Sequence, residues 1–333
     1  MKNNKKISFP IDFVVTWVDG NDAQWQGEKS KYKKQEIDDK EKTHFRDPGL
    51  FKYWFRGVEK FAPWVNHIYL VTNGQYPEFL DTNIKNLTWV RHEEIMPQDS
   101  LPTFNSNAIE LSIDKIKGLS EHFVVFNDDM FLIKPVKPTD FFDVDGKPKD
   151  TAGLNQIMPV EDFDHSIANN ITIINKKFDK KKVLSEQWHL FLNIKNGPLN
   201  IYTLLLWFFP RFSRLYDLHI PYSLTKENFK AFFDLAPLWK EKTIRTRFRS
   251  KNDLTIWGVR YFQIVSGKIS PRVYNFGKFY TYKQKDAIIK ELCKAKHSVI
   301  DINDVEIENY DRIVFEIVNA FEKKFPEKST FEK

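Results

Sequence analysis

Two neighbouring aspartates, Asp128 and Asp129, follow four consecutive apolar residues at positions 123–126. A run that is apolar at every position predicts a strand buried on both faces, and open α/β sheets bind ligands beyond the carboxyl ends of such strands. Adjacent carboxylates at that place can hold a divalent cation together with the phosphate oxygens of a nucleotide diphosphate. We therefore expect Asp128 and Asp129 to be metal ligands, and the alternative is a solvated Asp-Asp turn.

Asp19 and Asp22 occupy the same kind of position at the end of the first predicted strand, residues 11–18. Side chains placed there can bind uridine, ribose or a metal ion. Turns also favour Asp and Asn, which hydrogen-bond to their own backbone, so a purely structural turn is the alternative.

The pair Arg46-Asp47 lies just before the first predicted helix, residues 50–61. The entrance of a helix attracts phosphate, and an arginine side chain can bind phosphate through two parallel hydrogen bonds. We expect Arg46 to contact a phosphate group. The alternative is a surface salt bridge between Arg46 and Asp47.

Residues 101–110 form a proline-fixed, amide-rich loop that leads into a predicted helix at 107–116. Ser106 or Asn107 is placed to cap the helix and Glu110 to complete a capping box, and capping alone would explain much of the segment.

Two further groups can do chemistry. His219 lies in Leu-His-Ile-Pro and could act as a catalytic base, although a lone histidine is usually structural. Residues 243–253 form a basic cluster that contains Arg245, Arg247 and Arg249. Such a cluster can clamp a phosphate group, or it can be a solvated face.

The order of elements predicts an α/β fold with a mostly parallel central sheet. Over residues 1–150, short β-branched and aromatic runs alternate with helical patterns, which favours parallel strands covered by helices. We expect residues 1–150 to form the nucleotide-sugar and metal-binding core, and the more helical residues 151–333 to complete the active site and the acceptor side. Strands are predicted at 11–18, 67–72, 87–91 and 123–126, and helices at 50–61, 107–116 and 311–325.

The composition bounds the class of protein. The 333 residues include 51 Lys and Arg against 45 Asp and Glu, a net charge of +6. This excess is too small, and its charges are too interleaved, to indicate a nucleic-acid binder, but it favours anionic substrates. The single cysteine, Cys293, excludes an internal disulfide and fits a reducing cytoplasm.

The longest uncharged apolar run, residues 201–209, has about half of the ~20 residues that a bilayer-spanning helix needs. The run does not span a membrane. It is followed by Pro210, Arg211 and Arg214. We favour a helix buried in the core, and the alternative is an aromatic and basic segment at a membrane interface.

Taken together, these segments resemble the Stealth family of bacterial capsular and cell-wall polysaccharide phosphotransferases, which share their catalytic region with the animal lysosomal-enzyme N-acetylglucosamine-1-phosphotransferase. The resemblance runs nearly continuously from residue 11 to residue 131. Looser matches follow around residues 164–178 and from His219. The matching segments are Ile11-Asp12-Phe13-Val14-Val15-Thr16-Trp17-Val18-Asp19-Gly20, Phe45-Arg46-Asp47, Ala62-Pro63-Trp64-Val65, Ile68-Tyr69-Leu70-Val71-Thr72, Leu101-Pro102-Thr103-Phe104-Asn105-Ser106 and Phe126-Asn127-Asp128-Asp129-Met130-Phe131.

The resemblance implies a GT-A-like sheet of the nucleotide-sugar-transferase type and a specific reaction. A sugar-1-phosphate would pass from a UDP-sugar to a hydroxyl of a growing capsular or cell-wall polysaccharide or of a lipid-linked oligosaccharide, with release of UMP. The enzyme would work at the cytoplasmic face of the bacterial cell membrane, in peripheral contact with it.

The resemblance also implies a role for each candidate residue. His219 fills the position of the family's catalytic histidine, and with an unperturbed pKa of ~6.5 it would accept the acceptor's proton near pH 7. Arg249 fills the position of the phosphate-binding arginine, although Arg245 and Arg247 lie close enough to take its role. Asp128 and the catalytic Asp129 would carry Mg²⁺ or Mn²⁺. The nucleotide would be seated by Asp19, Asp22, Arg46, Asp47, Asn105 and Ser106.

Two alternatives remain open at the level of the sequence. A conventional metal-dependent glycosyltransferase would use the same acidic pair but release UDP. A non-catalytic polysaccharide-binding scaffold could stack sugars on the abundant Phe, Tyr and Trp side chains, although most of these fall in strand and helix patterns.

Overall fold

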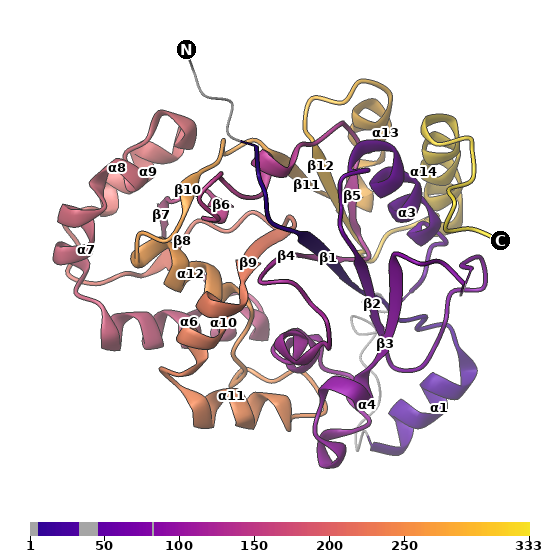
Figure 1. The fold of residues 1–333 in the computed structure, drawn as a ribbon, viewed down its shortest axis with the longest axis horizontal. Coiled ribbons are helices and arrows are strands. Elements are labelled where there is room, and N and C mark those ends of the chain that lie inside the picture. The colour runs from indigo at the N-terminus through magenta and orange to yellow at the C-terminus, as the bar shows by residue number, and fades with distance from the viewer. Residues whose placement is uncertain (1–5, 33–45, 82) are drawn as a thin grey trace.

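The computed structural model describes residues 6–32, 46–81 and 83–333, and it is organised around a five-stranded sheet (Figure 1). The first four strands in the sheet order are parallel, and the last pairs antiparallel with its neighbour. The predicted α/β class with a mostly parallel central sheet is therefore confirmed. The strand order is β3 (Leu87–Arg91), β2 (Ile68–Thr72), β1 (Ile11–Thr16), β4 (His122–Asn127) and β9 (Tyr222–Thr225).

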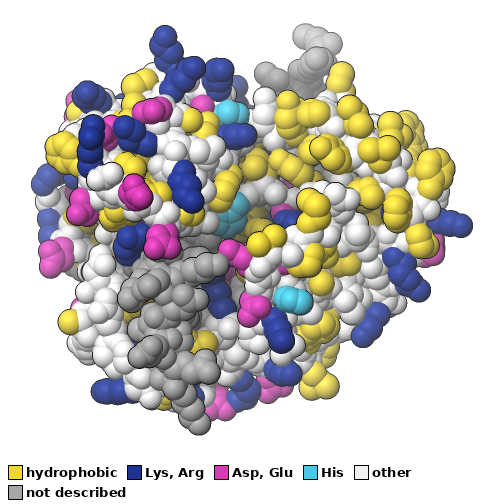
Figure 2. All heavy atoms as spheres, turned by 180° about the vertical axis from the view of Figure 1, so that it is seen from behind, with side chains coloured by type: hydrophobic (Ala, Val, Ile, Leu, Met, Phe, Trp, Pro, Cys, Tyr) yellow, Lys and Arg dark blue, Asp and Glu magenta, His cyan; other side chains and the backbone are white. Residues whose placement is uncertain are grey.

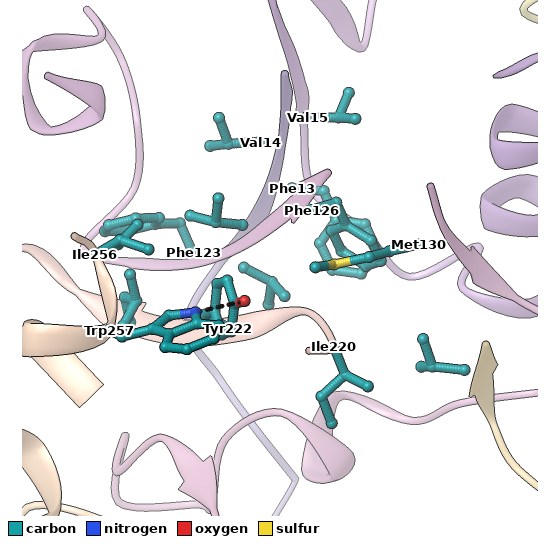
Figure 3. Packing of buried hydrophobic residues seen from close by; sticks show 14 of the residues in the cluster. Phe13, Val14, Val15, Phe123, Phe126, Met130, Ile220, Tyr222, Ile256 and Trp257 are labelled. Carbon is teal, nitrogen blue, oxygen red and sulfur yellow. Dashed lines mark hydrogen bonds between the residues drawn. The ribbon is translucent and has the colours of Figure 1, made fainter. Parts of the chain in front are cut away.

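Strands β1 and β4 lie inside this sheet because their residues are apolar on both faces. Val14 of β1 pairs with Val125 of β4 in parallel register, and both are fully buried. Figure 3 shows Phe13 and Phe126 packed beside Met130, with ring centroids of the two phenylalanines 4.7 Å apart. The space around these strands is filled mostly with apolar side chains, and the buried Asp12 near the start of β1 is satisfied by Asn66 and the amide of Ser120.

A second sheet brings the end of the chain beside the end of β4. Its strand order is β11 (Gly277–Thr281), β12 (Val299–Asn303) and β5 (Met130–Leu132). Strand β5 begins directly after Asp129, and its Met130 pairs with Asp301 of the antiparallel β12. The amide of Ile302 also donates to the carbonyl of Asp129 at 3.0 Å. This pairing places Asp301 next to the acidic residues that follow β4.

Two short strand pairs and a set of helices complete the structure. The pairs are β6 (Lys149–Asp150) with β10 (Ser270–Pro271), and β7 (Leu154–Asn155) with β8 (Arg214–Leu215). Helices α7 to α9 lie at one end of the molecule and α13 and α14 lie at the other (Figure 1). The helices are α1 (Ala23–Tyr32), α3 (Phe51–Phe61), α4 (His92–Ile95), α5 (Ser106–Glu110), α6 (Asp162–Lys177), α7 (Lys180–Glu186), α8 (Trp188–Phe191), α9 (Leu199–Leu206), α10 (Lys226–Phe233), α11 (Pro237–Ile244), α12 (Trp257–Val265), α13 (Lys285–Cys293) and α14 (Tyr310–Lys324).

The expected elements hold with two differences. The helix expected at 107–116 ends after Glu110, and a separate 3₁₀ turn follows at Ile113–Lys115. The segment 201–209 is helical up to Leu206, but the expectation that it is buried is wrong, because in α9 only Thr203 is buried. The more helical second half of the chain is confirmed, and β9 from that half extends the central sheet.

Candidate active site

Three side chains that can hold a metal ion meet at the carboxyl end of β4. They are Asp129 from the turn after β4, His219 from the segment that precedes β9, and Asp301 from β12. One ligand atom of each lies within 4.8 Å of the others. We call this group the Asp129 cluster. Three distant parts of the chain reach the same point because β4 pairs with β9 and β5 pairs with β12.

Asp301 fixes the orientation of His219. Nδ1 of His219 forms an ion pair with Oδ2 of Asp301, whose side chain is fully buried. Nε2 of His219 lies 3.4 Å from Nδ2 of Asn127. Burial lowers the pKa of His219, but the carboxylates of Asp301, Asp129 and Glu110 outweigh it and raise the pKa to about 9. The expectation that His219 is largely neutral near pH 7 is therefore not met in the protein alone.

The cluster carries more negative charge than its own residues neutralise. Burial and the charge of Asp301 raise the pKa of Asp129 well above its ordinary value, although His219 opposes the shift. Within the described part of the chain, Oδ1 of Asp129 and Oδ1 of Asp301 are buried without a hydrogen-bond partner. Because a buried carboxylate without a partner is costly, these orphaned oxygens fit a site that binds a cation.

The donor set also suits a divalent cation. Its three ligand atoms lie within 4.8 Å of one another, and two of the three side chains are carboxylates. Carboxylates suit both Mg²⁺ and Mn²⁺. Asp128 is not part of this group. Burial and the charges of Asp47 and Asp301 raise its pKa, so Asp128 lies close both to Asp47 and to the Asp129 cluster.

Arg249 adds a fixed positive charge next to the cluster. Its guanidinium donates to Oγ of Ser106 through Nη2 at 2.6 Å and through Nε at 3.1 Å. Arg249 is exposed to solvent, so an incoming anion can reach it. The charges of Glu110, Asp253 and Asp129 act on it, so Arg249 lies close to the Asp129 cluster.

The loop of Arg249 is held by Asn105 and Asp253. Nδ2 of Asn105 donates to Oδ2 of Asp253 at 2.8 Å, and the amide of Ser250 donates to the same oxygen at 3.0 Å. Oδ1 of Asn105 accepts from the amide of Asn107 at 3.0 Å and so caps α5. The expected caps, Ser106 or Asn107 with Glu110 in a capping box, are therefore wrong: Asn105 is the cap, and Ser106 is free to receive Arg249.

The other two arginines of the basic cluster have different partners. Arg245 forms exposed ion pairs with Asp99 and Glu241. Arg247 donates to the carbonyl of Leu101 at 3.1 Å. Arg249 is therefore the arginine that the structure brings to the Asp129 cluster.

The sequence analysis missed two residues of this site. Asp301 is fully buried, and its only sequence signal is a single carboxylate inside the apolar strand Val-Ile-Asp-Ile-Asn. Glu110 was considered only as a cap. Burial raises the pKa of Glu110 to about 7, while the charges of Arg249 and His219 oppose the shift, so Glu110 faces the same site.

A second group of candidates lines a neighbouring cavity of about 440 Å³. Asp19, Asp22 and Asp47 lie on its wall with Trp17, Gly49, Phe51, Gln75, Tyr76, Pro77, Glu78 and Phe79. The amide of Asp19 donates to Oε1 of Gln75 at 2.9 Å, and Oδ1 of Asp22 accepts from the amide of Trp25 at 2.6 Å. Since Asp47 influences the pKa of Asp128, the cavity lies next to the Asp129 cluster without including it.

Arg46 does not form the salt bridge with Asp47 that was the alternative to a phosphate contact. Its Nε and Nη2 donate to the two oxygens of Asp304 at 2.8 and 2.9 Å, and its guanidinium stacks 3.9 Å above the ring of Tyr310. Asp304 follows Asp301 by three residues. Arg46 is thus held near the site, with two of its nitrogens already engaged by Asp304.

Comparison with known proteins gives the chain a family. Two family models match, Stealth protein conserved region 1 over residues 9–36 and Stealth protein conserved region 2 over residues 44–150. The matched ranges include the acidic residues after β1 and β4 and the loop with Asn105 and Ser106. His219 and Arg249 lie outside them.

Relatives match over nearly the whole length. The exopolysaccharide phosphotransferase cps2G of Lactiplantibacillus plantarum is 46% identical over 98% of this chain and 97% of its own. The capsular polysaccharide phosphotransferase WcwK of Streptococcus pneumoniae is 42% identical over the full length of both chains. The receptor polysaccharide phosphotransferase WefC of Streptococcus oralis is 38% identical over 97% of this chain and 99% of its own.

Among solved structures, the galactosyltransferase LgtC in complex with donor and acceptor sugar analogs covers 94% of this chain, with a TM-score of 0.41 and 8% sequence identity. A likeness this distant bears on neither the residues nor the reaction. Two Stealth family models match the chain, and relatives more than 40% identical match it over nearly their whole length. This chain therefore belongs to the Stealth family.

Proposed function

We propose that this protein is a polysaccharide phosphotransferase that moves a sugar-1-phosphate from a UDP-sugar to a hydroxyl of a growing capsular or cell-wall polysaccharide or a lipid-linked oligosaccharide, and releases UMP. The names of the relatives support phosphotransfer in the making of such polysaccharides. The observation that carries the proposal is the position of Arg249 and Ser106 beside the Asp129 cluster. Charge of both signs is thereby available where a phosphate would react.

Arg249 would bind the phosphate that is transferred. An arginine fork donates two parallel hydrogen bonds to phosphate oxygens, and it stabilises the negative charge that grows on them in the transition state. Ser106 holds this fork in the protein alone, and its hydroxyl can turn to the substrate when phosphate takes its place. Asn105 and Asp253 hold Ser106 and Arg249 in position through their hydrogen bonds to the loop of Arg249.

Asp129 and Asp301 would hold a divalent cation, with Asp128 next to them. When bound there, Mg²⁺ or Mn²⁺ would supply positive charge to the transferred phosphate and to the departing UMP. The support for this role is the pair of orphaned carboxylate oxygens and the spacing of the donor atoms.

His219 would accept the proton of the acceptor hydroxyl. Its Nδ1 is taken by Asp301, so Nε2 is the ring nitrogen left to face a substrate. With a pKa of about 9, His219 holds a proton at pH 7 in the protein alone. It becomes a base when positive charge offsets Asp129 and Asp301, because those carboxylates are what raise its pKa.

The cavity beside Asp47 would take the uridine part of the donor. Its aromatic side chains offer faces for a base, and Asp19, Asp22 and Asp47 offer acceptors for ribose hydroxyls. The carboxylates of this cavity would repel phosphate, so the diphosphate of the donor would bind outside it, next to Arg249. Arg46, clamped by Asp304, would add positive charge from near β12.

The test is an analysis of the nucleotide product. The protein is incubated with a panel of UDP-sugars, Mn²⁺ and a polysaccharide or lipid-linked acceptor, and the products are separated and identified by mass spectrometry. We expect UMP and an acceptor heavier by a hexose phosphate. Release of UDP instead would indicate a conventional glycosyltransferase. Full polymer formation by Asp129→Ala would indicate a scaffold.

Dependence on the cation is tested in the same assay. Excess chelator should abolish UMP release, and added Mg²⁺ or Mn²⁺ should restore it. Undiminished turnover in chelator would remove the metal from the proposal and leave Arg249 as its main support. If the acceptor is lipid-linked, the reaction would take place at the inner face of the bacterial cell membrane.

A further inference from the structure

One end of the molecule exposes an unusual number of large apolar side chains. Ile194 is 93% exposed, Phe208 88% and Leu205 69%. Figure 2 shows hydrophobic side chains gathered on the side of the molecule where the α7–α9 end of Figure 1 lies after the half-turn. We call this surface the α9 face. It consists of Trp188, Ile194, Ile201, Tyr202, Leu204, Leu205, Phe208 and Phe209, each more than half exposed.

The α9 face is a built surface rather than a loose loop. Nζ of the buried Lys180 donates to the carbonyls of Leu206 and Phe209 at 2.6 and 2.9 Å, which fixes the end of α9. Asn175 exchanges two hydrogen bonds with the backbone of Phe212, at 2.7 and 3.0 Å. The structure therefore fixes the backbone beneath this face while its apolar side chains stay exposed to water, which is unfavourable.

Positive charge surrounds this face. Residues 176–214 contain eight lysines and arginines and two acidic residues, a net charge of +6 that equals the net charge of the whole chain. Between Gly197 and Pro210 the sequence has no charged residue. Lys176, Lys177, Lys181, Lys182, Lys195 and Arg211 are exposed around the apolar centre. An apolar centre with a basic rim matches the interface of a membrane that contains anionic lipids.

We propose that the α9 face seats the protein on a bilayer rich in anionic lipid, with the side chains of α9 in the acyl boundary and the basic rim on the headgroups. Helix α9 has eight residues and is about 12 Å long, so it lies in the interface. No helix within residues 6–32, 46–81 and 83–333 is long and apolar enough to cross a membrane. A second copy of the chain fits less well, because the two basic rims would repel each other.

The inference rests on the α9 face alone and does not depend on the proposed reaction. A lipid-linked acceptor would also bring the enzyme to the membrane, but the proposal for the α9 face is argued without it. Both statements can fail separately, because vesicle binding and UMP release are measured in separate assays.

The experiment is flotation of the full chain with vesicles of phosphatidylcholine alone or with about one third phosphatidylglycerol. We expect the wild type to float with the anionic vesicles and to float at least about tenfold less with neutral ones. The double variant Leu205→Ser/Phe208→Ser should lower flotation at least about tenfold. Lys181→Glu/Lys182→Glu should lower it most on anionic vesicles, and added salt should have the same effect.

A matched control uses exposed apolar residues elsewhere. Leu238 of α11 is 81% exposed and Phe315 of α14 is 65% exposed, so Leu238→Ser/Phe315→Ser removes similar apolar surface without touching the α9 face. This variant should float as the wild type does. Failure of the wild type to float, or equal loss in both variants, would overturn the proposal. Self-association that Leu205→Ser/Phe208→Ser abolishes would assign the face to a second copy instead.

Discussion

Two clusters of buried charge in this protein differ in how they are balanced. In the first, Arg260 donates to both oxygens of Asp150 at 2.8 Å and to Asp217 at 2.7 Å, while Tyr261 donates to Asp217 at 2.5 Å. In the second, the Asp129 cluster, the carboxylates outnumber the cations and two of their oxygens have no described partner. We call the first group, Asp150, Asp217, Arg260 and Tyr261, the Arg260 cluster.

The difference separates a cluster that holds the fold from one that is prepared for a ligand. Burial raises the pKa of Asp150, but the two arginines Arg260 and Arg272 outweigh it and hold the pKa below its ordinary value. Burial raises the pKa of Asp217, but the charges of Arg260 and Arg214 oppose the shift. The pKa of Asp129 rises well above its ordinary value, and His219 is the cation that opposes this shift. Native folding supplies partners for the Arg260 cluster, and it leaves the Asp129 cluster short of positive charge.

The largest expected effect is the loss of turnover in Asp129→Asn. The amide has nearly the same shape but cannot act as an anionic ligand, so the rate of UMP release should fall at least about 10³-fold. The melting temperature should not fall, because the substitution removes a charge that the fold does not balance. Mn²⁺ should raise the melting temperature of the wild type but not of the variant. A large loss of stability in the variant would show that the Asp129 cluster stabilises the fold as the Arg260 cluster does.

Asp150→Asn should have the opposite profile. It leaves Arg260 buried with an incomplete partner, so we expect the free energy of unfolding to fall by about 3–5 kcal/mol in chemical denaturation. Turnover per folded molecule should stay at the wild-type level. If Asp150→Asn does not fold, Tyr261→Phe removes only the hydrogen bond to Asp217 and should cost about 1–3 kcal/mol. A turnover defect in Tyr261→Phe without loss of stability would contradict the distinction.

The sequence predicts the strands of the central sheet well but only part of the Asp129 cluster. The run at 123–126 is apolar at every position, and the run at 11–18 is mostly β-branched and aromatic; such patterns have few interpretations other than an inner strand. Asp129 is found because it directly follows such a run. Asp301 is missed because its place depends on the pairing of β12 with β5, strands about 170 residues apart, which no local pattern encodes.

Local sequence patterns also fail to place the α9 face and to distinguish the three arginines of the basic cluster. An uncharged apolar helix has one sequence pattern whether it is buried or exposed, so the sequence cannot place residues 201–209. Three arginines at alternating positions look equivalent in the sequence. Their partners distinguish them, and those partners, Asp99, Leu101 and Ser106, come from a distant segment.

The pH dependence of stability tests whether the site around Glu110 carries excess negative charge. Its pKa rises from 4.5 to about 7 on folding because the side chain is buried. Between these values the folded state binds more protons than the unfolded state, so this residue makes stability fall as the pH rises, by up to about 3 kcal/mol. Glu110→Gln should therefore be more stable than the wild type at pH 8 and nearly equal to it at pH 4.5.

Chemical denaturation at several pH values measures this difference. The exposed Glu308 provides a matched control, since Glu308→Gln should follow the wild type at every pH. If Glu110→Gln were instead less stable than the wild type at pH 8, the charges of Arg249 and His219 would outweigh burial, and the site would not be short of positive charge.

The smallest expected effect concerns charges that belong to neither cluster. Arg245 is exposed and pairs with Asp99 and Glu241 at the surface, where solvent and salt screen the attraction. Arg245→Ala should leave the melting temperature and kcat/KM unchanged within error, whereas the same substitution at Arg249 should lower kcat/KM about 10²-fold. The two arginines are four residues apart and share one basic segment, so only their surroundings differ. A comparable loss of kcat/KM in both variants would mean that phosphate is bound by the segment as a whole, and the short contact of Arg249 with Ser106 would then have no special role.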